Sequence, residues 1–537
     1  MLCPPTGYEA IQCYYTLRLL AQQLADAGFH ALRIDYHGTG ESLGSDEDPG
    51  RVAAWFDSIT TAVDVLAALD EVEAVGLIGI RLGATLAARV ASENDLVRQV
   101  VLWEPCASGS AYTRELEILA SATTSLLGAE SVRTPDGDPG GIVAAGYQLT
   151  AETIGGLDTL RLDRFALKPH TAVLVVERDD RPGNLRLAEH LSGLGCETTV
   201  ERLAGYKELM VEPARSRAPQ ATLDRIRTWA LERSHAASGA ASRPLLAPEA
   251  KSGSLRHRPV RFGPAGRLFG VVTEPSSPDA LQPAVVFLAG GVVPRTAVNR
   301  LYVSAARRLA ALGHTVLRLD ISGIGESPPA DGAGPNDAYA ASLVPDVVTA
   351  IGWLGERDVW LVGLCSGAYA AFQAASTESR VTGAVLINPI VFHGAQGMSR
   401  DSTQVQQVQA SRQYSRSLTD AAKWRKLLSG QVDVRFALGV LWARARTWAA
   451  SRSGRGLPAD LRQLLGRGVR VGIAFSEGDP GVDAFTSQVG ARLPELEKRG
   501  LVIRHFAGAD HTFNPLAARG MLLDWVVGHI SDARHSQ

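Results

Sequence analysis

The chain has 537 residues, enough for about two to four domains, and 45% of them are hydrophobic and 20% charged, as in ordinary globular α/β proteins. Its net charge of −2 excludes a general electrostatic attraction to nucleic acid or membrane. Five scattered cysteines, without a C-x-x-C or Cys/His cluster, argue against a disulfide framework and against zinc.

The amino-terminal sequence MLCPPTGYEAIQCYY lacks the basic region and apolar run of a signal peptide. No apolar stretch approaches the ~20 residues that span a bilayer. We therefore expect a cytoplasmic protein in a reducing compartment, with no membrane span, no metal and no cofactor.

The first half alternates helical periods with buried strands. Leu20–Ser42 combines an amphipathic helix, a glycine stop, a strand ending in Asp35 and a G-x-G-E-S turn. Further segments that each contain a strand follow at Ala74–Ser92, Val101–Pro105, Ala172–Asp180 and Arg202–Met210. This alternation predicts the α/β class, with a mostly parallel, doubly wound sheet covered by helices on both faces.

A stretch rich in Ala, Ser, Gly and Pro predicts a linker over residues 234–255, which separates domains at 1–233 and 256–537. The second half opens with two alternating runs around Gly-Pro-Ala-Gly at 256–274, which predict a β-hairpin before the strand at 284–288. The first half has no counterpart of this hairpin. It begins part-way through the equivalent strand, so either its start lies upstream or it has lost its antiparallel edge.

The second half repeats the first. LAQQLADAGFHALRIDYHGTGES aligns with AARRLAALGHTVLRLDISGIGES, and Asp35 and Asp320 lie 285 positions apart. AVGLIGIRLGATLAARVAS aligns with VWLVGLCSGAYAAFQAAS, and Arg81 and Cys365 lie 284 apart. Three later blocks match in the same order. A repeat of this length predicts a duplicated domain rather than a solenoid.

Residues 391–466 of the second half show helical periods without a clear strand, which predicts a helical lid over the carboxyl side of the sheet. From Arg400 to Arg470 there are fourteen Arg or Lys against four Asp. This excess is either a solvated helical face or a docking surface for an anionic carrier: a phosphopantetheine arm, CoA or an acidic carrier protein.

The sequence Gly363-Leu-Cys-Ser-Gly367 ends an apolar run and precedes a helix-compatible segment. This is the strand–turn–helix pattern of a nucleophile elbow, G-x-S-x-G, with Cys365 at its apex. A buried structural cysteine is the alternative. A cysteine nucleophile needs a base to form thiolate, and the base needs an acid to orient it.

Downstream residues supply these partners in the order nucleophile, acid, histidine. Asp479 and His511 each follow a buried strand, where parallel sheets place their ligand sites. Asp483 is the second candidate for the acid and Asp510 a more distant third. His505 is a weaker candidate for the base because it lies inside a strand. Backbone N–H groups complete the site, and we expect those of Ser366 and Gly291 to bind the oxyanion.

The first half lacks this set of residues. Arg81 occupies the apex and Glu208 the histidine position, and an always-charged guanidinium cannot attack a carbonyl. Only the acidic segment Glu177–Asp180 remains. We expect Arg81 to pair with Asp179 or Asp180 in a catalytically silent domain; binding of an anionic group by Arg81 is the alternative.

With these motifs, the chain resembles a tandem α/β-hydrolase, similar to serine-aminopeptidase-like members of that superfamily. The first half, through CPPTGYEAIQCYYTLRLLAQQLADAGFHALRIDYHGTGES and GIRLGA, resembles hydrolase-like proteins associated with bacterial exosortase systems. The second half, through AGGVVPRTAVNRLYVSAARRLAALGHTVLRLDISGIGESP, resembles the companion type found in such tandem proteins. The cysteine at the elbow departs from the usual serine. In this respect it resembles dienelactone hydrolases, bile-acid-type acyl-CoA N-acyltransferases and aminoacyltransferases that move acyl groups between carrier proteins.

The resemblance implies an acyl-transfer enzyme that forms an acyl-Cys365 intermediate, with hydrolysis or transfer decided by the acceptor. Its partner would be an acyl thioester, bound to CoA or to a carrier protein, and a homo-oligomer is compatible with the sequence. The alternatives are a carboxylic-ester hydrolase and a non-catalytic binding or scaffold protein.

Overall fold

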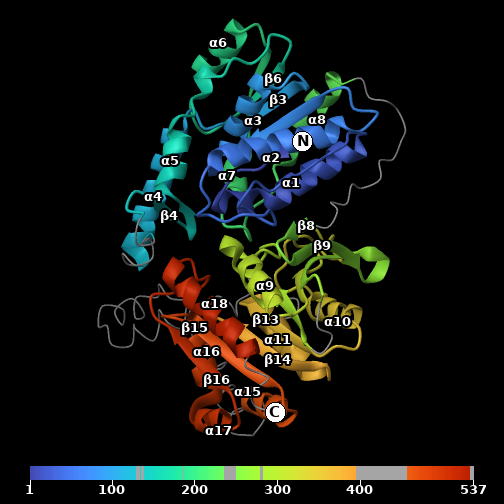
Figure 1. Cartoon of the computed structure of the whole chain (residues 1–537), viewed down its shortest axis with the longest axis vertical. Coiled ribbons are helices and arrows are strands. Elements are labelled where there is room, and N and C mark those ends of the chain that lie inside the picture. The colour runs from blue at the N-terminus through green and yellow to red at the C-terminus, as the bar shows by residue number, and fades with distance from the viewer. Residues whose placement is uncertain are drawn as a thin grey trace, which may run out of the picture. The chain divides into compact units, whose positions relative to one another are not determined.

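The computed structural model describes residues 1–127, 134, 138–183, 185–234, 250–277, 282–394 and 456–531 (Figure 1). The chain divides into two compact units. Unit 1 comprises Met1–Leu246, Val298–Arg300 and Asn514–Leu516; unit 2 comprises Ala247–Ala297, Leu301–Phe513 and Ala517–Gln537.

Unit 2 contains a nine-stranded sheet in the order β16-β15-β14-β13-β11-β12-β10-β9-β8. The strands from β11 to β16 pair in parallel, while β8, β9 and β10 are antiparallel. Their bounds are β8 (Ala250–Ser252), β9 (Leu255–Phe262), β10 (Leu268–Pro275), β11 (Ala284–Leu288), β12 (Val316–Asp320), β13 (Val359–Leu364), β14 (Val381–Ile387), β15 (Arg470–Ser476) and β16 (Val502–Phe506).

The hairpin predicted at 256–274 is present as β9 and β10. The end of the predicted linker, residues 234–255, contains the strand β8. Its residues pair with β9 through Ala250–His257 and Lys251–Arg256, so this part of the chain belongs to the sheet. Most of the predicted lid, residues 395–455, lies outside the described residues, as do residues 235–249 of the linker.

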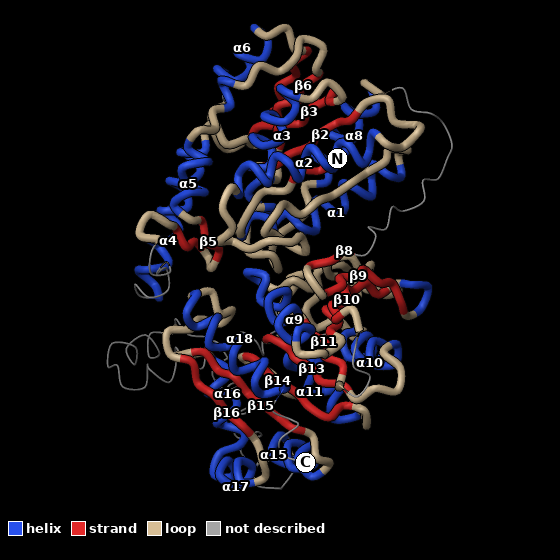
Figure 2. Tube along the Cα trace, in the orientation of Figure 1, coloured by secondary structure: helices blue, strands red, loops and turns tan. Residues whose placement is uncertain are grey.

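Helices cover both faces of this sheet, as Figure 2 shows. A buried cluster joins α9 and α18 to side chains such as Val285, Trp360 and Val385, whereas α11 packs on β13 and β14. The described helices after residue 250 are η3 (Pro264–Gly266), η4 (Val298–Arg300, which belongs to unit 1), α9 (Leu301–Ala311), α10 (Leu343–Trp353), α11 (Ser366–Thr377), α15 (Leu457–Gly466), α16 (Pro480–Val489), η5 (Gly490–Arg492), α17 (Leu493–Lys498) and α18 (Leu516–Ser531).

Unit 1 contains a five-stranded parallel sheet in the order β1-β2-β3-β6-β7, which matches β11-β13-β14-β15-β16 in connectivity. The segment equivalent to β12 contributes only an isolated bridge between Leu2 and Arg33. The strands are β1 (Leu2–Cys3), β2 (Val75–Ile80), β3 (Val97–Trp103), β6 (Ala172–Arg178) and β7 (Glu197–Leu203), with a separate antiparallel pair β4 (Ile142–Ala144) and β5 (Tyr147–Leu149).

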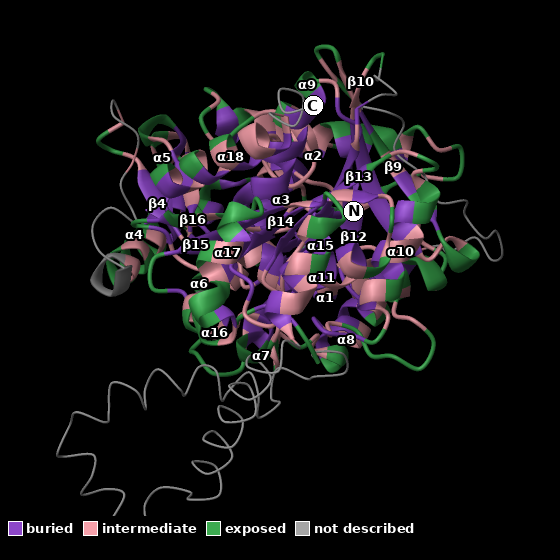
Figure 3. Ribbon diagram, turned by 90° about the horizontal axis from the view of Figure 1, so that it is seen from below, coloured by how far each residue is buried: buried purple, intermediate pink, exposed green. Residues whose placement is uncertain are grey.

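Two apolar clusters lie on the two faces of the unit 1 sheet, since successive strand residues alternate between them. Leu77 and Val100 belong to one cluster and Ile78 and Val101 to the other. Figure 3 shows the buried strands and inward helix faces in purple. The helices are α1 (Tyr8–Asp26), α2 (Arg51–Ala67), α3 (Leu82–Glu93), α4 (Gly109–Leu127), α5 (Ala151–Asp158), η2 (Leu162–Arg164), α6 (Leu185–Gly193), α7 (Tyr206–Leu209) and α8 (Gln220–Glu232). The prediction of mostly parallel, doubly wound sheets is therefore confirmed.

The G-x-G-E-S turn of unit 2 folds around the buried carboxylate of Asp320. The backbone N–H groups of Glu326 and Arg295 donate to that carboxylate at 2.9 and 2.7 Å, and the Arg295 guanidinium adds an ion pair at 2.7 Å. Ser327 donates its hydroxyl to the Asp320 carbonyl at 2.7 Å. A Cβ at Gly325 would lie 2.2 Å from the same carboxylate, so the turn requires glycine there.

Unit 1 repeats this turn around Asp35. The Glu41 N–H donates to the Asp35 carboxylate at 2.9 Å, and the Ser42 hydroxyl donates to the Asp35 carbonyl at 2.6 Å. A Cβ at Gly40 would lie 2.1 Å from the carboxylate. The shared motif therefore stabilises the backbone in both units and is not a catalytic signature.

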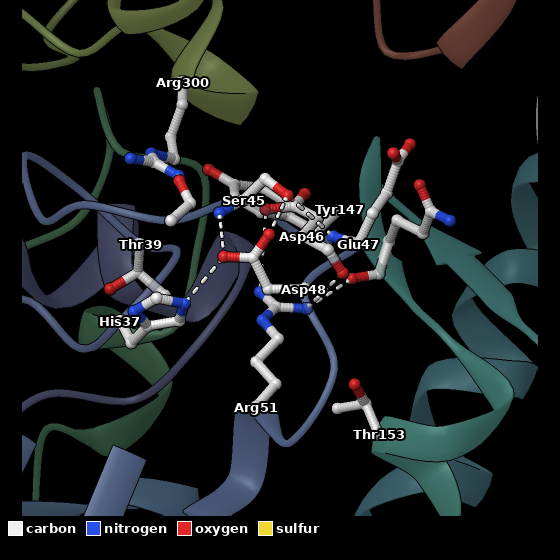
Figure 4. A network of polar contacts seen from close by, with 12 residues as sticks. His37, Thr39, Ser45, Asp46, Glu47, Asp48, Arg51, Tyr147, Thr153 and Arg300 are labelled. Carbon is white, nitrogen blue, oxygen red and sulfur yellow. Dashed lines mark hydrogen bonds and ion pairs between the residues drawn. The ribbon is translucent and has the colours of Figure 1, made fainter. Parts of the chain in front are cut away.

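The loop that follows in unit 1 is held by the polar network of Figure 4. Asp48 accepts hydrogen bonds from the Ser45 N–H and hydroxyl at 3.0 and 2.8 Å, and it bonds His37 Nε2 at 2.8 Å. The bonds from Ser45 and His37 lower the pKa of Asp48. The buried Arg51 donates to the Gln148 carbonyl at 2.9 Å and so ties the loop to β5. These contacts hold the loop in one conformation and join it to β5.

Candidate active site

The turn between β13 and α11 places Cys365 in a strained backbone conformation, with φ 54° and ψ −113°. Two glycines make the turn possible. A Cβ at Gly363 would lie 2.1 Å from the Gly367 carbonyl oxygen, and a Cβ at Gly367 would lie 2.1 Å from the Leu288 carbonyl oxygen. The pattern of the sequence therefore produces the expected elbow, with the half-exposed Cys365 at its apex.

Asp479 and His511 lie in contact, as their order in the sequence predicts. Asp479 follows β15 and caps α16, where its Oδ1 accepts the Gly481 N–H at 2.7 Å. Its Oδ2 lies 2.6 Å from His511 Nδ1, and the Asp479 side chain is fully buried. The carboxylate thus fixes the ring orientation and leaves Nε2 for another partner.

That other partner is the thiol of Cys365, to which His511 is hydrogen-bonded. Burial disfavours the charged imidazole, but the negative charge on Cys365 and the hydrogen bonds with Asp479 and Cys365 outweigh this effect. Together they raise the pKa of His511 to about 10. The arrangement therefore favours a thiolate–imidazolium pair at neutral pH.

The residue that bonds His511 Nδ1 is Asp479, the first of the predicted acids. His505 lies in β16 and stacks on the Phe475 ring at 5.7 Å. Asp483 lies in the first turn of α16, whereas Asp479 is the carboxylate that bonds His511.

Asn388 is a residue of the site that sequence reasoning missed. It is fully buried, has φ 45°, and donates from Nδ2 to the His511 carbonyl at 2.8 Å and to the Ser476 hydroxyl at 3.0 Å. Its Oδ1 accepts the Ser476 N–H at 2.8 Å. Asn388 therefore connects the end of β14 to β15 and to the histidine loop. The signal available in the sequence was an asparagine directly after a buried strand, in Val-Leu-Ile-Asn-Pro.

One of the two predicted oxyanion donors, the Gly291 N–H, has another partner in the structure. The loop after β11 does approach the elbow closely, since a Cβ at Gly290 would lie 2.4 Å from the Leu364 carbonyl oxygen. The Gly291 N–H, however, donates to the Ser366 hydroxyl oxygen at 2.9 Å. Because a backbone amide has a single proton, this N–H already has an acceptor.

The equivalent turn in unit 1 keeps the backbone shape with different side chains. Arg81 has φ 56° and ψ −125°. Its expected pairing with Asp179 or Asp180 is wrong, because Arg81 Nε donates to Glu9 at 3.0 Å and its Nη2 contacts Glu115. These carboxylates come from α1 and α4, which the spacing of the sequence could not place beside the turn.

Asp180 instead pairs with two cations of its own neighbourhood. Arg178 lies 2.7 Å from its carboxylate and Lys207 lies 3.2 Å from it, and their hydrogen bonds lower the pKa of Asp180. Glu208, at the position that matches His511, belongs to the short helix α7.

The loop of unit 1 that matches the oxyanion loop has two prolines where unit 2 has residues with backbone N–H groups. The pairing Cys3–Gly79 matches Leu288–Gly363, so Pro4 and Pro5 stand where unit 2 has Ala289 and Gly290. Proline has no N–H to donate. Unit 1 therefore lacks the nucleophile, the base and two backbone donors at the corresponding positions.

No group of His, Cys, Asp and Glu side chains in the described ranges could hold a metal ion. Of the helices in the described ranges, none is long and apolar enough to cross a membrane.

Alkylation with iodoacetamide at pH 7 is expected to modify one of the five cysteines. The other four are buried, and burial raises their pKa values, to about 12 for Cys3 and Cys106. The His511 imidazolium persists until the pH rises through its pKa of about 10. The rate at which iodoacetamide alkylates Cys365 should therefore stay level between pH 7 and 9. Peptide mapping and the pH–rate profile test this. A second modified cysteine, or a rate that climbs tenfold per pH unit, would contradict it.

Comparison with known proteins agrees with this geometry. Residues 285–535 match the model of the Alpha/beta hydrolase family. No curated protein matches the chain. The solved structures similar to it include ferulic acid-bound Est1E from Butyrivibrio proteoclasticus (18% identity, 43% of this chain and 88% of that one, TM-score 0.31) and brefeldin A esterase, a bacterial homologue of human hormone-sensitive lipase (19%, 55% and 80%, 0.33).

An α/β serine hydrolase homologue from Coxiella burnetii is also similar, with 16% identity over 53% of this chain and all of that one, at a TM-score of 0.29. Likenesses at this level carry no argument about substrate. Residues 285–535 thus match the alpha/beta hydrolase family model, and the sheet order and the elbow of unit 2 agree with that fold, which supports a hydrolase enzyme.

Proposed function

We propose that unit 2 hydrolyses carboxylic esters through an acyl-cysteine intermediate on Cys365. The observation that carries this proposal is the connected set Cys365–His511–Asp479, in which the 2.6 Å bond between His511 and Asp479 orients a base toward the apex of the elbow. The family match favours hydrolysis over acyl transfer as the overall reaction.

In the first half-reaction the Cys365 thiolate attacks the carbonyl carbon of the ester, and the carbonyl oxygen takes the electron pair as an oxyanion. As the carbonyl re-forms, the C–O bond to the alcohol breaks. The His511 imidazolium gives its proton to the departing alkoxide. The products are a free alcohol, an acyl thioester on Cys365 and a neutral imidazole.

In the second half-reaction neutral His511 removes a proton from water, and the hydroxide attacks the thioester carbonyl. The C–S bond breaks, which releases the carboxylic acid and restores the thiolate beside an imidazolium. Asp479 stays ionised throughout and holds the ring in one orientation.

The second candidate function is acyl transfer or hydrolysis with an acyl thioester as substrate. The presence of a cysteine at the apex of the elbow favours it. A thiolate exchanges acyl groups with other thiols readily, so CoA or a carrier protein could serve as donor, with a second thiol or water as acceptor. The basic segment from Arg400 to Arg470, proposed as the carrier docking surface, lies mostly outside the described residues.

Intact-protein mass spectrometry separates these candidates. With p-nitrophenyl butyrate the wild-type protein should gain one butyryl group, mapped to Cys365, and lose it in water as butyrate appears. Butyryl-CoA supplies the thioester arm. Faster acylation by the thioester, with release accelerated by added thiol, would favour the second candidate. Absence of an adduct and of hydrolysis with both donors would contradict both.

Unit 1 is proposed to be a duplicated, catalytically silent counterpart of unit 2. Its strand order and its Asp35 turn match those of unit 2, while its apex, histidine and oxyanion-loop positions differ. Binding of an anionic group is the alternative role for Arg81, although Glu9 and Glu115 already neutralise that guanidinium.

A further inference from the structure

The side chain of Ser366 occupies a position next to the reacting atoms that the mechanism above does not use. Ser366 directly follows Cys365 and begins α11, and it is fully buried. Its hydroxyl oxygen lies 2.9 Å from the backbone nitrogen of Gly291, on the loop that closes over the elbow.

The oxyanion needs donors at about 2.7–3.1 Å from its final position. In a nucleophile elbow these are the N–H of the residue after the nucleophile and one N–H from the loop after the matching strand. Here they are the amides of Ser366 and Gly291, and the proton of Gly291 is already bonded to the Ser366 hydroxyl. The Gly291 N–H is therefore directed at the Ser366 hydroxyl oxygen and is not free for a substrate oxygen in this arrangement.

A serine hydroxyl has one proton to donate and two lone pairs to accept with. One lone pair of Ser366 receives the Gly291 N–H. Within the described part of the chain no acceptor is found for the proton of the hydroxyl. That proton is thus left to donate while the oxygen is held in place from the other side.

We propose that the Ser366 hydroxyl is a catalytic oxyanion donor, fixed and polarised by the Gly291 N–H behind it. The oxyanion formed by attack of Cys365 then receives two hydrogen bonds from one residue, from the N–H and the O–H of Ser366. The Gly291 bond strengthens the second of these, because hydrogen bonds in a chain polarise one another. The inference rests on the proposed acyl-cysteine chemistry.

The unit 1 turn provides an internal contrast. Leu82 stands at the position of Ser366, and Thr6 stands at that of Gly291, with its hydroxyl bonded to Tyr112 at 2.8 Å. The half of the chain that lacks a nucleophile thus also lacks the hydroxyl.

Replacing Ser366 with alanine distinguishes this role from simple occupation of the Gly291 N–H. If the hydroxyl donates, single-turnover acylation by p-nitrophenyl butyrate should slow about 10- to 100-fold, in the range found for loss of an oxyanion donor. If the hydroxyl only occupies the amide, the alanine variant frees Gly291 for the substrate. Acylation at the wild-type rate or faster would overturn the proposal.

Two controls make the result specific. Iodoacetamide attack forms no oxyanion, so the alkylation rate of Cys365 should be the same in Ser366→Ala as in the wild type; a matching fall would show damage to the thiolate and overturn the oxyanion role. Ser366→Thr keeps a hydroxyl and should retain acylation within a few-fold of wild type. If the wild type itself is not acylated, the proposed function fails; if only the alanine effect is missing, this inference alone fails.

Discussion

Replacing Cys365 with alanine is expected to abolish the acyl adduct and to lower ester hydrolysis by about 10⁴-fold or more. Loss of a covalent nucleophile removes the whole two-step path, and only binding and oxyanion stabilisation remain. Steady-state kinetics with p-nitrophenyl butyrate and intact-protein mass spectrometry measure the two effects.

Cys196→Ala is the control, since it removes a different thiol of the same chain, a buried one in unit 1, and should leave hydrolysis unchanged. Cys365→Ala retaining more than a tenth of wild-type activity would refute the cysteine mechanism. Cys365→Ser is informative as well. A serine hydroxyl does not form a stable anion beside an imidazolium, so the acyl adduct should form far more slowly than on the thiolate.

Replacing His511 with alanine is expected to reduce ester hydrolysis by about 10³- to 10⁴-fold, because the acid of the first step and the base of the second are the same ring. Alkylation responds differently. Without the imidazolium, Cys365 should behave as an ordinary thiol, so its reaction at pH 7 slows and then recovers as the pH rises above about 8.5. Hydrolysis should not recover, since water still lacks a base.

His505→Ala is the matched control for this prediction, because His505 is a neighbouring histidine that stacks on Phe475 and does not bond Asp479. Asp479→Asn should also lower the rate, by loss of ring orientation and of imidazolium stabilisation. Equal pH–rate profiles for alkylation in wild type and His511→Ala would show that His511 does not control the thiol.

The sequence predicts this site well where the relevant geometry is local. Gly363 and Gly367 specify the elbow because each lies against backbone atoms that leave no room for a Cβ. This requirement for glycine appears in the sequence as two glycines, each two residues from Cys365. Asp479 and His511 could be paired because parallel strands bring their carboxyl ends to one edge of the sheet.

Contacts that depend on the orientation of one backbone amide or one side chain could not be predicted from the sequence. The bond from Gly291 to Ser366 depends on which way one amide points in a loop. The partners of Arg81 lie on α1 and α4, 72 and 34 positions away in the chain. The role of Asn388 requires the His511 carbonyl and Ser476 to meet at one point, which no periodicity encodes.

The backbone strain at the two elbows carries a consequence for how such proteins change over evolutionary time. Cys365 and Arg81 share a positive φ with a negative ψ, a sparsely populated backbone conformation that costs roughly 1–3 kcal/mol. Unit 1 retains this cost although it holds no nucleophile at the apex. The close packing at Gly79 and Gly83, where a Cβ would meet backbone atoms at 2.4 and 2.2 Å, is sufficient to impose it. The fold therefore fixes the backbone of the apex whichever side chain stands there, and the same turn carries a cysteine in unit 2 and an arginine in unit 1. A nucleophile at Arg81 alone would not give unit 1 activity, since Glu208 stands where unit 2 has its histidine.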